Sequence, residues 1–323
     1  MARYRIETQV VNMDFFRLDW FQSSHRGAVV EFSPIANYRD VWRRIHFDRT
    51  FRGSHVVTGN VTVFVDSAGP QEALDSVEKL LIDYEHLLML AHYHDVFFSE
   101  LSCFEQDSDQ IVETREPDGR RGKAGSGCLL WAEFIPQFLT AALPRLDVTP
   151  GFRWALYWYN EVTALSPSQV PEIEVPSLWT AFESVASSIA TASGKDKLLS
   201  DKEIGALKNR IRPILAQMGL REVVRGQIYG HLKALSRPSI LYLGRDLLET
   251  YNFGQYANEV ESFYHLRNDI VHGRSLKLPA IIVVKRMFRL RRLLQKLLFS
   301  MAGICGIADA FRAPIESPDL SAI

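Results

Sequence analysis

The sequence is poor in cysteine, and this scarcity excludes two common kinds of small-domain framework. Cys103, Cys128 and Cys305 are the only three cysteines among 323 residues, and they lie far apart. Their number is odd and their spacing matches neither a disulfide scaffold nor a zinc site. We therefore expect a reducing compartment and no structural metal.

Long apolar runs and an excess of one charge are also missing. The longest apolar run, residues 278–284, contains Pro279 and is far too short to cross a bilayer. The first residues lack the apolar segment of a signal peptide. The net charge of -1 argues neither for nor against a nucleic-acid partner, so only a local basic patch can make that case. We expect a cytoplasmic protein without membrane contact.

No cofactor motif is present. Residues 122–125 read Gly-Lys-Ala-Gly, which is not the Gly-x-x-x-x-Gly-Lys-Ser/Thr pattern of a phosphate-binding loop. His92, His94 and Asp95 are close enough to ligate a metal, but no third ligand group accompanies them. We expect neither a cofactor nor a bound metal.

The first part of the chain predicts an α+β domain, residues 1–128. Short β-branched and aromatic segments alternate with turn residues, and one apolar stripe at helical spacing follows them. The expected strands are 4–11, 28–32, 61–65 and 96–104, and the expected helix is 71–92. Residues 105–127 are polar and glycine-rich, so we expect a long loop there.

From residue 129 the pattern is almost entirely helical, which predicts an all-α bundle over 129–312 and a flexible tail over 313–323. The expected helices are 129–143, 152–165, 177–192, 201–218, 221–235, 255–272 and 280–310. Ser177 and Ser200 are candidate helix caps, and Gly194 and Gly273 suit helix C-terminal ends. Pro213 predicts a kink or a break.

One segment carries most of the chemistry, Arg267-Asn268-Asp269-Ile270-Val271-His272-Gly273. Imidazole titrates near neutral pH and guanidinium binds anions, so His272 suits acid–base work and Arg267 suits holding a phosphate. Asn268 would orient the histidine or donate to the phosphate. RNA supplies its own nucleophile, the 2′-hydroxyl, so no metal is required. An ordinary helix end, with a capping histidine and a solvated arginine, is the alternative.

Helical geometry places Arg267 and His272 of one chain on different faces of the helix, so they do not readily reach the same group. Arg267 lies about 140° round the helical wheel from His272, at roughly 100° per residue. Glu261, His265, Asn268 and His272 instead share one polar stripe. A helix that loosens at Gly273, or a second copy of the chain, would bring the two groups together.

The segment resembles the R-x-x-x-x-H motif of the HEPN superfamily. Two upstream segments are similar to the Apea-like branch of that superfamily: the aromatic run at residues 154–159 and the Leu-Trp-x-Ala-x-Glu pattern at 178–183. The resemblance covers residues 129–310 and does not extend to the first hundred. It implies a helical bundle that dimerises into one composite site, with Arg267 and His272 as the catalytic pair.

The resemblance further implies a metal-independent endoribonuclease of a toxin, abortive-infection or other anti-phage defence system. Glu183 becomes a candidate partner for Arg267, and His265 a further supporting residue. Arg274 occupies the position where some members carry a tyrosine, so regulation through that tyrosine is not expected. The α+β domain is expected to receive a regulatory protein or a phage-derived trigger.

The last long helix carries two stripes. One is apolar with heptad-like spacing, which fits either bundle packing or a dimer seam. The other is basic and fits either a solvated face or contacts with an RNA backbone, and it contains Lys285, Arg289, Arg292 and Lys296.

Three hypotheses follow from the sequence. The leading one is a dimeric HEPN endoribonuclease. The second is a non-catalytic HEPN dimer that serves as a regulatory or interaction module, in which Arg267 and His272 are buried in internal hydrogen bonds. The third is a nucleic-acid-binding regulator that uses the basic stripe.

Overall fold

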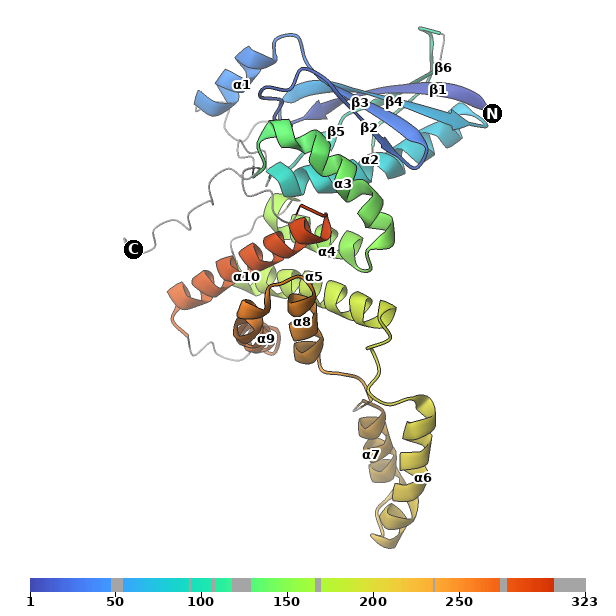
Figure 1. The fold of residues 1–323 in the computed structure, drawn as a ribbon, viewed down its shortest axis with the longest axis vertical. Helices are drawn as coiled ribbons and strands as arrows, with labels where there is room; N and C mark the ends of the chain where they lie inside the picture. Colours follow the sequence, from blue (N-terminus) through green and yellow to red (C-terminus); the bar gives the residue numbers. More distant parts are fainter. Residues whose placement is uncertain are drawn as a thin grey trace.

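The computed structural model describes residues 1–47, 55–92, 94–105, 108–117, 129–165, 170–234, 236–273 and 278–304. An antiparallel sheet with helices forms the N-terminal part, and the C-terminal part is helical (Figure 1). This agrees with the fold class expected from the sequence. The predicted domain boundary at residue 129 remains a prediction, because residues 118–128 lie outside the described residues.

The sheet is antiparallel, in the order β2-β3-β4-β1-β6-β7, and β5 also pairs with β1. Alternate residues of its central strand β1, such as Tyr4 and Ile6, are buried, whereas Glu7 and Gln9 are exposed. One face of the sheet is therefore packed and the other is solvated. The strands are β1 (Ala2–Val11), β2 (Phe21–His25), β3 (Ala28–Pro34), β4 (Val57–Ser67), β5 (Phe97–Phe98), β6 (Leu101–Glu105) and β7 (Ile111–Arg115).

The sequence-based assignment of this part was incomplete. It missed β2 and the helix α1 (Tyr38–Phe47), and it treated residues 111–115 as loop although they form β7. β7 is short and mostly exposed, and it lies at the sheet edge. Such a strand lacks the alternation of a half-buried one, so pairing with β6 alone defines it.

Helix α2 (Pro70–His92) is buried on two sides. It packs on the sheet with one face and against α3 (Ile135–Val148) and α4 (Phe152–Asn160) with another (Figure 1). Leu74, Leu88 and Leu90 are all fully buried along it. One continuous hydrophobic core therefore runs from the sheet into the helical part.

The helical part surrounds α5 (Pro171–Ala192), whose Trp179 and Phe182 side chains are completely buried. Helices α4, α8, α9 and α10 all pack against it. The remaining helices are α6 (Asp201–Gln217), α7 (Glu222–Ala234), α8 (Ile240–Thr250), α9 (Ala257–Val271) and α10 (Ala280–Met301). Among the described residues, no helix is long and apolar enough to cross a membrane.

The ends of the helices test several predictions made from the sequence. The capping box of Ser200 and Glu203 is confirmed, and Gly194 and Gly273 have the positive φ of helix C-terminal glycines. The cap at Ser177 was wrong: α5 begins at Pro171, and the Ser177 hydroxyl donates within the helix to Ile173. Helix α8 was missed, and α6 is not split at Pro213.

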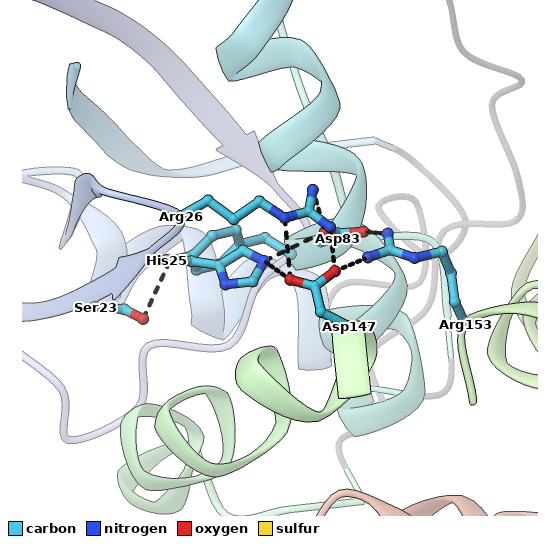
Figure 2. Close-up of polar contacts among 7 residues, drawn as sticks. Ser23, His25, Arg26, Asp83, Asp147 and Arg153 are labelled. Atoms are coloured by element: carbon cyan, nitrogen blue, oxygen red, sulfur yellow. Dashed lines mark hydrogen bonds and ion pairs between the residues drawn. The ribbon is translucent and has the colours of Figure 1, made fainter. Parts of the chain in front are cut away.

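A cluster of charged side chains lies where the sheet meets the helices (Figure 2). Asp83 on α2 is only 1% exposed and forms ion pairs with Arg153 at the start of α4 and with Arg26 in the β2–β3 turn. Asp147, near the end of α3, pairs with both arginines. His25 Nε2 lies 3.4 Å from the Asp83 carboxylate. The cluster thus joins the end of β2, the helix α2 and the α3–α4 junction, three regions that are distant in sequence.

Burial dominates the titration of the histidine in this cluster. It lowers the pKa of His25, and the adjacent Arg26 and Arg153 lower it further, against the opposing effect of Asp147. Arg26 in turn lowers the pKa of Asp147. His25 is therefore neutral and the Asp147 carboxylate is ionised at neutral pH.

We expect Asp83→Asn to lower the free energy of unfolding by about 3 kcal/mol, because it leaves two arginines facing a buried site without a charge. Urea unfolding monitored by fluorescence measures the loss. Asp147→Asn is the matched control, since its carboxylate is 41% exposed and the arginines there can be solvated. Equal losses in the two variants would contradict the buried role of Asp83.

A second histidine, His86 on α2, predicts how stability depends on pH. Burial lowers its pKa to about 4, whereas an unfolded histidine titrates near 6.5. Between these two pH values His86 is protonated in the unfolded chain and neutral in the folded chain. The free energy of unfolding therefore falls as pH drops from 6.5 towards 4. We expect His86→Gln to remove on the order of 2 kcal/mol of this dependence. Urea unfolding across that pH range tests this, and an unchanged profile would contradict it.

Candidate functional site

The Arg267–His272 segment forms the C-terminal end of α9. The helix ends at Val271, and His272 has left helical geometry at φ -89° and ψ 9°. Its N–H still donates to the Asn268 carbonyl at 3.0 Å, and Gly273 follows at φ 60°. Only glycine adopts that backbone conformation readily, so the Gly273 turn ends the helix directly after His272.

A small apolar cluster, separate from the main core, holds this helix end in place. It contains Val175 of α5, Leu266 of α9, and Val283 and Met287 of α10. Val260, Phe263 and Leu266 are buried, and Ile270 packs at the edge of the cluster. The apolar face of α9 is therefore fixed on the bundle, which leaves its polar face outward.

Arg267 is half-buried and contacts its neighbour. Its Nη1 donates to Asn268 Oδ1 at 3.0 Å. Among the residues that the structure describes, no carboxylate pairs with this guanidinium. A cation with a neutral partner keeps its charge available for an anion.

His272 is exposed and lies on the expected polar stripe. Within the described ranges, no side chain hydrogen-bonds to its imidazole. His265, about two turns earlier on the stripe, is also exposed and lies 3.9 Å from Glu261, which pairs in turn with Arg245 of α8. The supporting role predicted for His265 stays a prediction.

Glu183 has a different partner from the one that the resemblance implied. Its carboxylate accepts a hydrogen bond from the Trp179 indole at 2.6 Å, one turn away on α5. The Trp179 ring in turn contacts Tyr264 of α9, with 5.9 Å between ring centroids. Glu183 therefore reaches α9 through an aromatic contact, and no ion pair between Glu183 and Arg267 is present among the described residues.

The basic stripe of α10 is exposed along its whole length, at Lys285, Arg289, Arg292 and Lys296. Lys296 Nζ donates to the Tyr256 hydroxyl at 3.0 Å. Arg291 does not belong to this face, because it forms an ion pair with the fully buried Glu174 of α5. Burial raises the pKa of Glu174, although Arg291 opposes that shift.

The apolar stripe of α10 packs inside the bundle. Its members Val283, Met287, Leu290, Leu294, Leu297 and Met301 are all buried. The expectation of bundle packing is therefore confirmed, and the alternative of a dimer seam along this stripe was wrong.

His92 and His94 bind backbone instead of gathering around a metal. His92 Nε2 accepts from the Asp14 N–H at 3.0 Å, and its Nδ1 lies 2.8 Å from the Leu88 carbonyl. Both ring nitrogens of His94 lie 2.9 Å from backbone carbonyls, those of His92 and Asn12. No group of three potential metal ligands occurs within the part of the chain that the structure describes.

The arrangement combines an accessible imidazole, a guanidinium without a carboxylate partner and an amide on one helix end. These groups can exchange a proton and bind an anion. The Asp83 cluster is the chemically unusual feature that the sequence did not indicate. Its residues come from three regions of the chain that are distant in sequence, and no local spacing links those regions.

Comparison with family models, curated proteins and solved structures found no match to this chain.

Glu183 could act as a hydrogen-bond acceptor for the Trp179 indole or as a charge partner for a cation such as Arg267, and two variants distinguish these roles. We expect Glu183→Gln to leave stability nearly unchanged, because the amide oxygen still accepts from the indole. Glu183→Leu should lower the free energy of unfolding by about 1–2 kcal/mol, because it leaves a buried donor without a partner. Thermal unfolding compares the two variants, and a large loss in Glu183→Gln would point instead to a charge partner such as Arg267.

Proposed function

We propose that this protein is a metal-independent endoribonuclease of the HEPN type that acts as a dimer. One observation carries the proposal: α9 ends in an exposed imidazole five residues after a guanidinium that no described carboxylate neutralises. The exposed basic stripe on α10 supports it, since an RNA substrate is a polyanion.

The proposed reaction is an internal transfer of the phosphodiester. One His272 imidazole takes the proton of the 2′-hydroxyl, and O2′ forms a bond to phosphorus. The bond from phosphorus to O5′ breaks, and His272 of a second copy gives a proton to that oxygen. Arg267 stabilises the charge that develops on the phosphate. The products are a 2′,3′-cyclic phosphate and a 5′-hydroxyl, and no water or metal is consumed.

The dimer is inferred from the spacing of the two residues. On an ideal helical wheel Arg267 and His272 lie about 140° apart, which disfavours a single chain that brings both groups to one phosphate. A two-fold axis beside the end of α9 supplies the missing group from a second copy. We therefore expect the specific activity to fall when the protein is diluted until the dimer dissociates.

The biological role rests on the resemblance of the sequence. A toxin or anti-phage effector kept inactive until triggered fits a helical nuclease that packs against an N-terminal sheet. In this proposal the N-terminal sheet with α1 and α2 receives the regulatory protein or the phage-derived trigger. The Asp83 cluster, which joins the sheet to α3 and α4, is a physical connection through which such a signal can travel.

The non-catalytic alternative predicts that Arg267 and His272 are buried in internal hydrogen bonds. The exposure of His272 does not favour it. The nuclease and the non-catalytic module also differ in what they predict for RNA. A non-catalytic module leaves RNA intact under all conditions.

We expect the purified protein to cleave RNA in EDTA and His272→Ala to lose activity by at least about a hundredfold, the typical contribution of a general acid or base. Gel electrophoresis of end-labelled RNA measures cleavage and identifies the cyclic phosphate. His55→Ala is the control, because it removes an exposed histidine of the N-terminal part, away from α9.

Expression in cells that are then infected with phage tests the proposed activation by a phage-derived trigger. Growth arrest that depends on His272 would support the nuclease. Equal cleavage by wild type and His272→Ala, or no cleavage and no arrest by wild type, would reject it.

A further inference from the structure

Helices α6 and α7 form an arm that stands away from the rest of the molecule (Figure 1). Each contacts the other more than any further element of the described chain. At the base of the arm, the Leu198 N–H donates to the Ser236 carbonyl at 2.6 Å, which ties the two connecting segments together. Lys195 pairs with Asp246 of α8 at 2.7 Å and anchors the base on the bundle.

The arm is strongly basic in a chain whose net charge is -1. Residues 201–234 contain seven lysines and arginines and only three acidic residues. Two of the three acids are already engaged: Asp201 pairs with Lys197, and Glu203 caps α6 at Ser200. The arm therefore carries an excess of positive charge that its own acids do not neutralise.

The cations of the arm have no acidic partners among the described residues. This holds for Lys208, Arg210, Arg212, Arg221 and Arg225. Lys208 and Arg212 are like charges four residues apart on α6, and such a pair destabilises a helix by a few tenths of a kcal/mol. An anion from outside the arm would offset this repulsion.

The partner that suits this surface is a nucleic-acid backbone. The centre of a protein–protein interface is depleted in charge, whereas nucleic-acid-binding surfaces are rich in clustered arginine and lysine. The buried apolar residues found within the arm are Ile204 and Leu215. Exposed Met218 and Val223 at the tip are the feature that would suit a second copy instead.

We propose that the α6–α7 arm binds the phosphate backbone of RNA, at a place separate from the Arg267–His272 site. The inference rests on the proposed function for the identity of the polyanion. The arm would bind the RNA substrate through its phosphate charges, without recognising the base sequence. Its place outside the Arg267–His272 motif makes binding and cleavage separable by mutation.

The test measures RNA binding in a His272→Ala background, in which the proposed cleavage is blocked. The arm variant is Arg210→Glu, Arg212→Glu and Arg221→Glu, and all three of these side chains are exposed. The control changes the same net charge on the N-terminal part, at exposed Arg39, Arg43 and Lys79, each to Glu. A second arm variant with glutamine at the three positions gives a milder change that disturbs folding less.

Fluorescence anisotropy with a short single-stranded RNA of mixed sequence is recorded at several salt concentrations. We expect the arm variant to bind at least about tenfold more weakly than the control. The slope of log K against log salt should become shallower by about 2, since each lost phosphate contact contributes about 0.7. The glutamine variant should lie between the two, and circular dichroism confirms that each variant is folded.

Arm and control variants that bind equally would overturn the inference, as would a wild-type protein that binds no RNA. An arm variant that binds RNA like the control but loses its dimer, by light scattering, would assign the arm to a second copy. Failure of the nuclease proposal can be distinguished from failure of this inference. A protein that never cleaves RNA can still be tested for RNA binding by the arm.

Discussion

The buried carboxylate of Asp83 is the interaction on which the joining of the two parts depends. It is almost inaccessible, and Arg26 and Arg153 approach it from the sheet side and the helical side of α2. Moving such a charge out of water is unfavourable unless opposite charges surround it, so the three groups require one another. This requirement fixes the β2–β3 turn, α2 and the start of α4 in one arrangement, and the continuous hydrophobic core then fills the space between them.

The helical part depends in the same way on α5. Four helices pack on it, and a second buried acid, Glu174, is neutralised by Arg291 of α10. Glu174 follows Ile173 and precedes Val175, which belongs to the small cluster that holds the end of α9. The position of Arg267 and His272 therefore follows from the packing of three helices. A nuclease site built here would have rigid support on one side and solvent on the other.

Sequence patterns anticipated long elements well and short ones poorly. The apolar stripes of α2 and α10 were both correct, because a helix of several turns repeats its signal. Helix α8, β2 and β7 were missed because each has eleven residues or fewer and little pattern of its own. At Ser177 a proline followed by serine suggested a helix start, yet Pro171 begins the helix, and Pro176 lies within its second turn.

By itself, the sequence determined the α+β and all-helical division, the helix that ends at His272 and Gly273, and the basic stripe of α10. These follow from local backbone preferences and from periodicity, which neighbouring residues encode. Only the tertiary structure decided three contacts. Arg291 forms an ion pair with Glu174, Glu183 accepts a hydrogen bond from Trp179, and Asp83 forms ion pairs with two arginines. Each of these contacts depends on which side chains share a buried space. Asp83 and its arginines, and Glu174 and Arg291, are far apart in the chain, so no local pattern indicates that they meet.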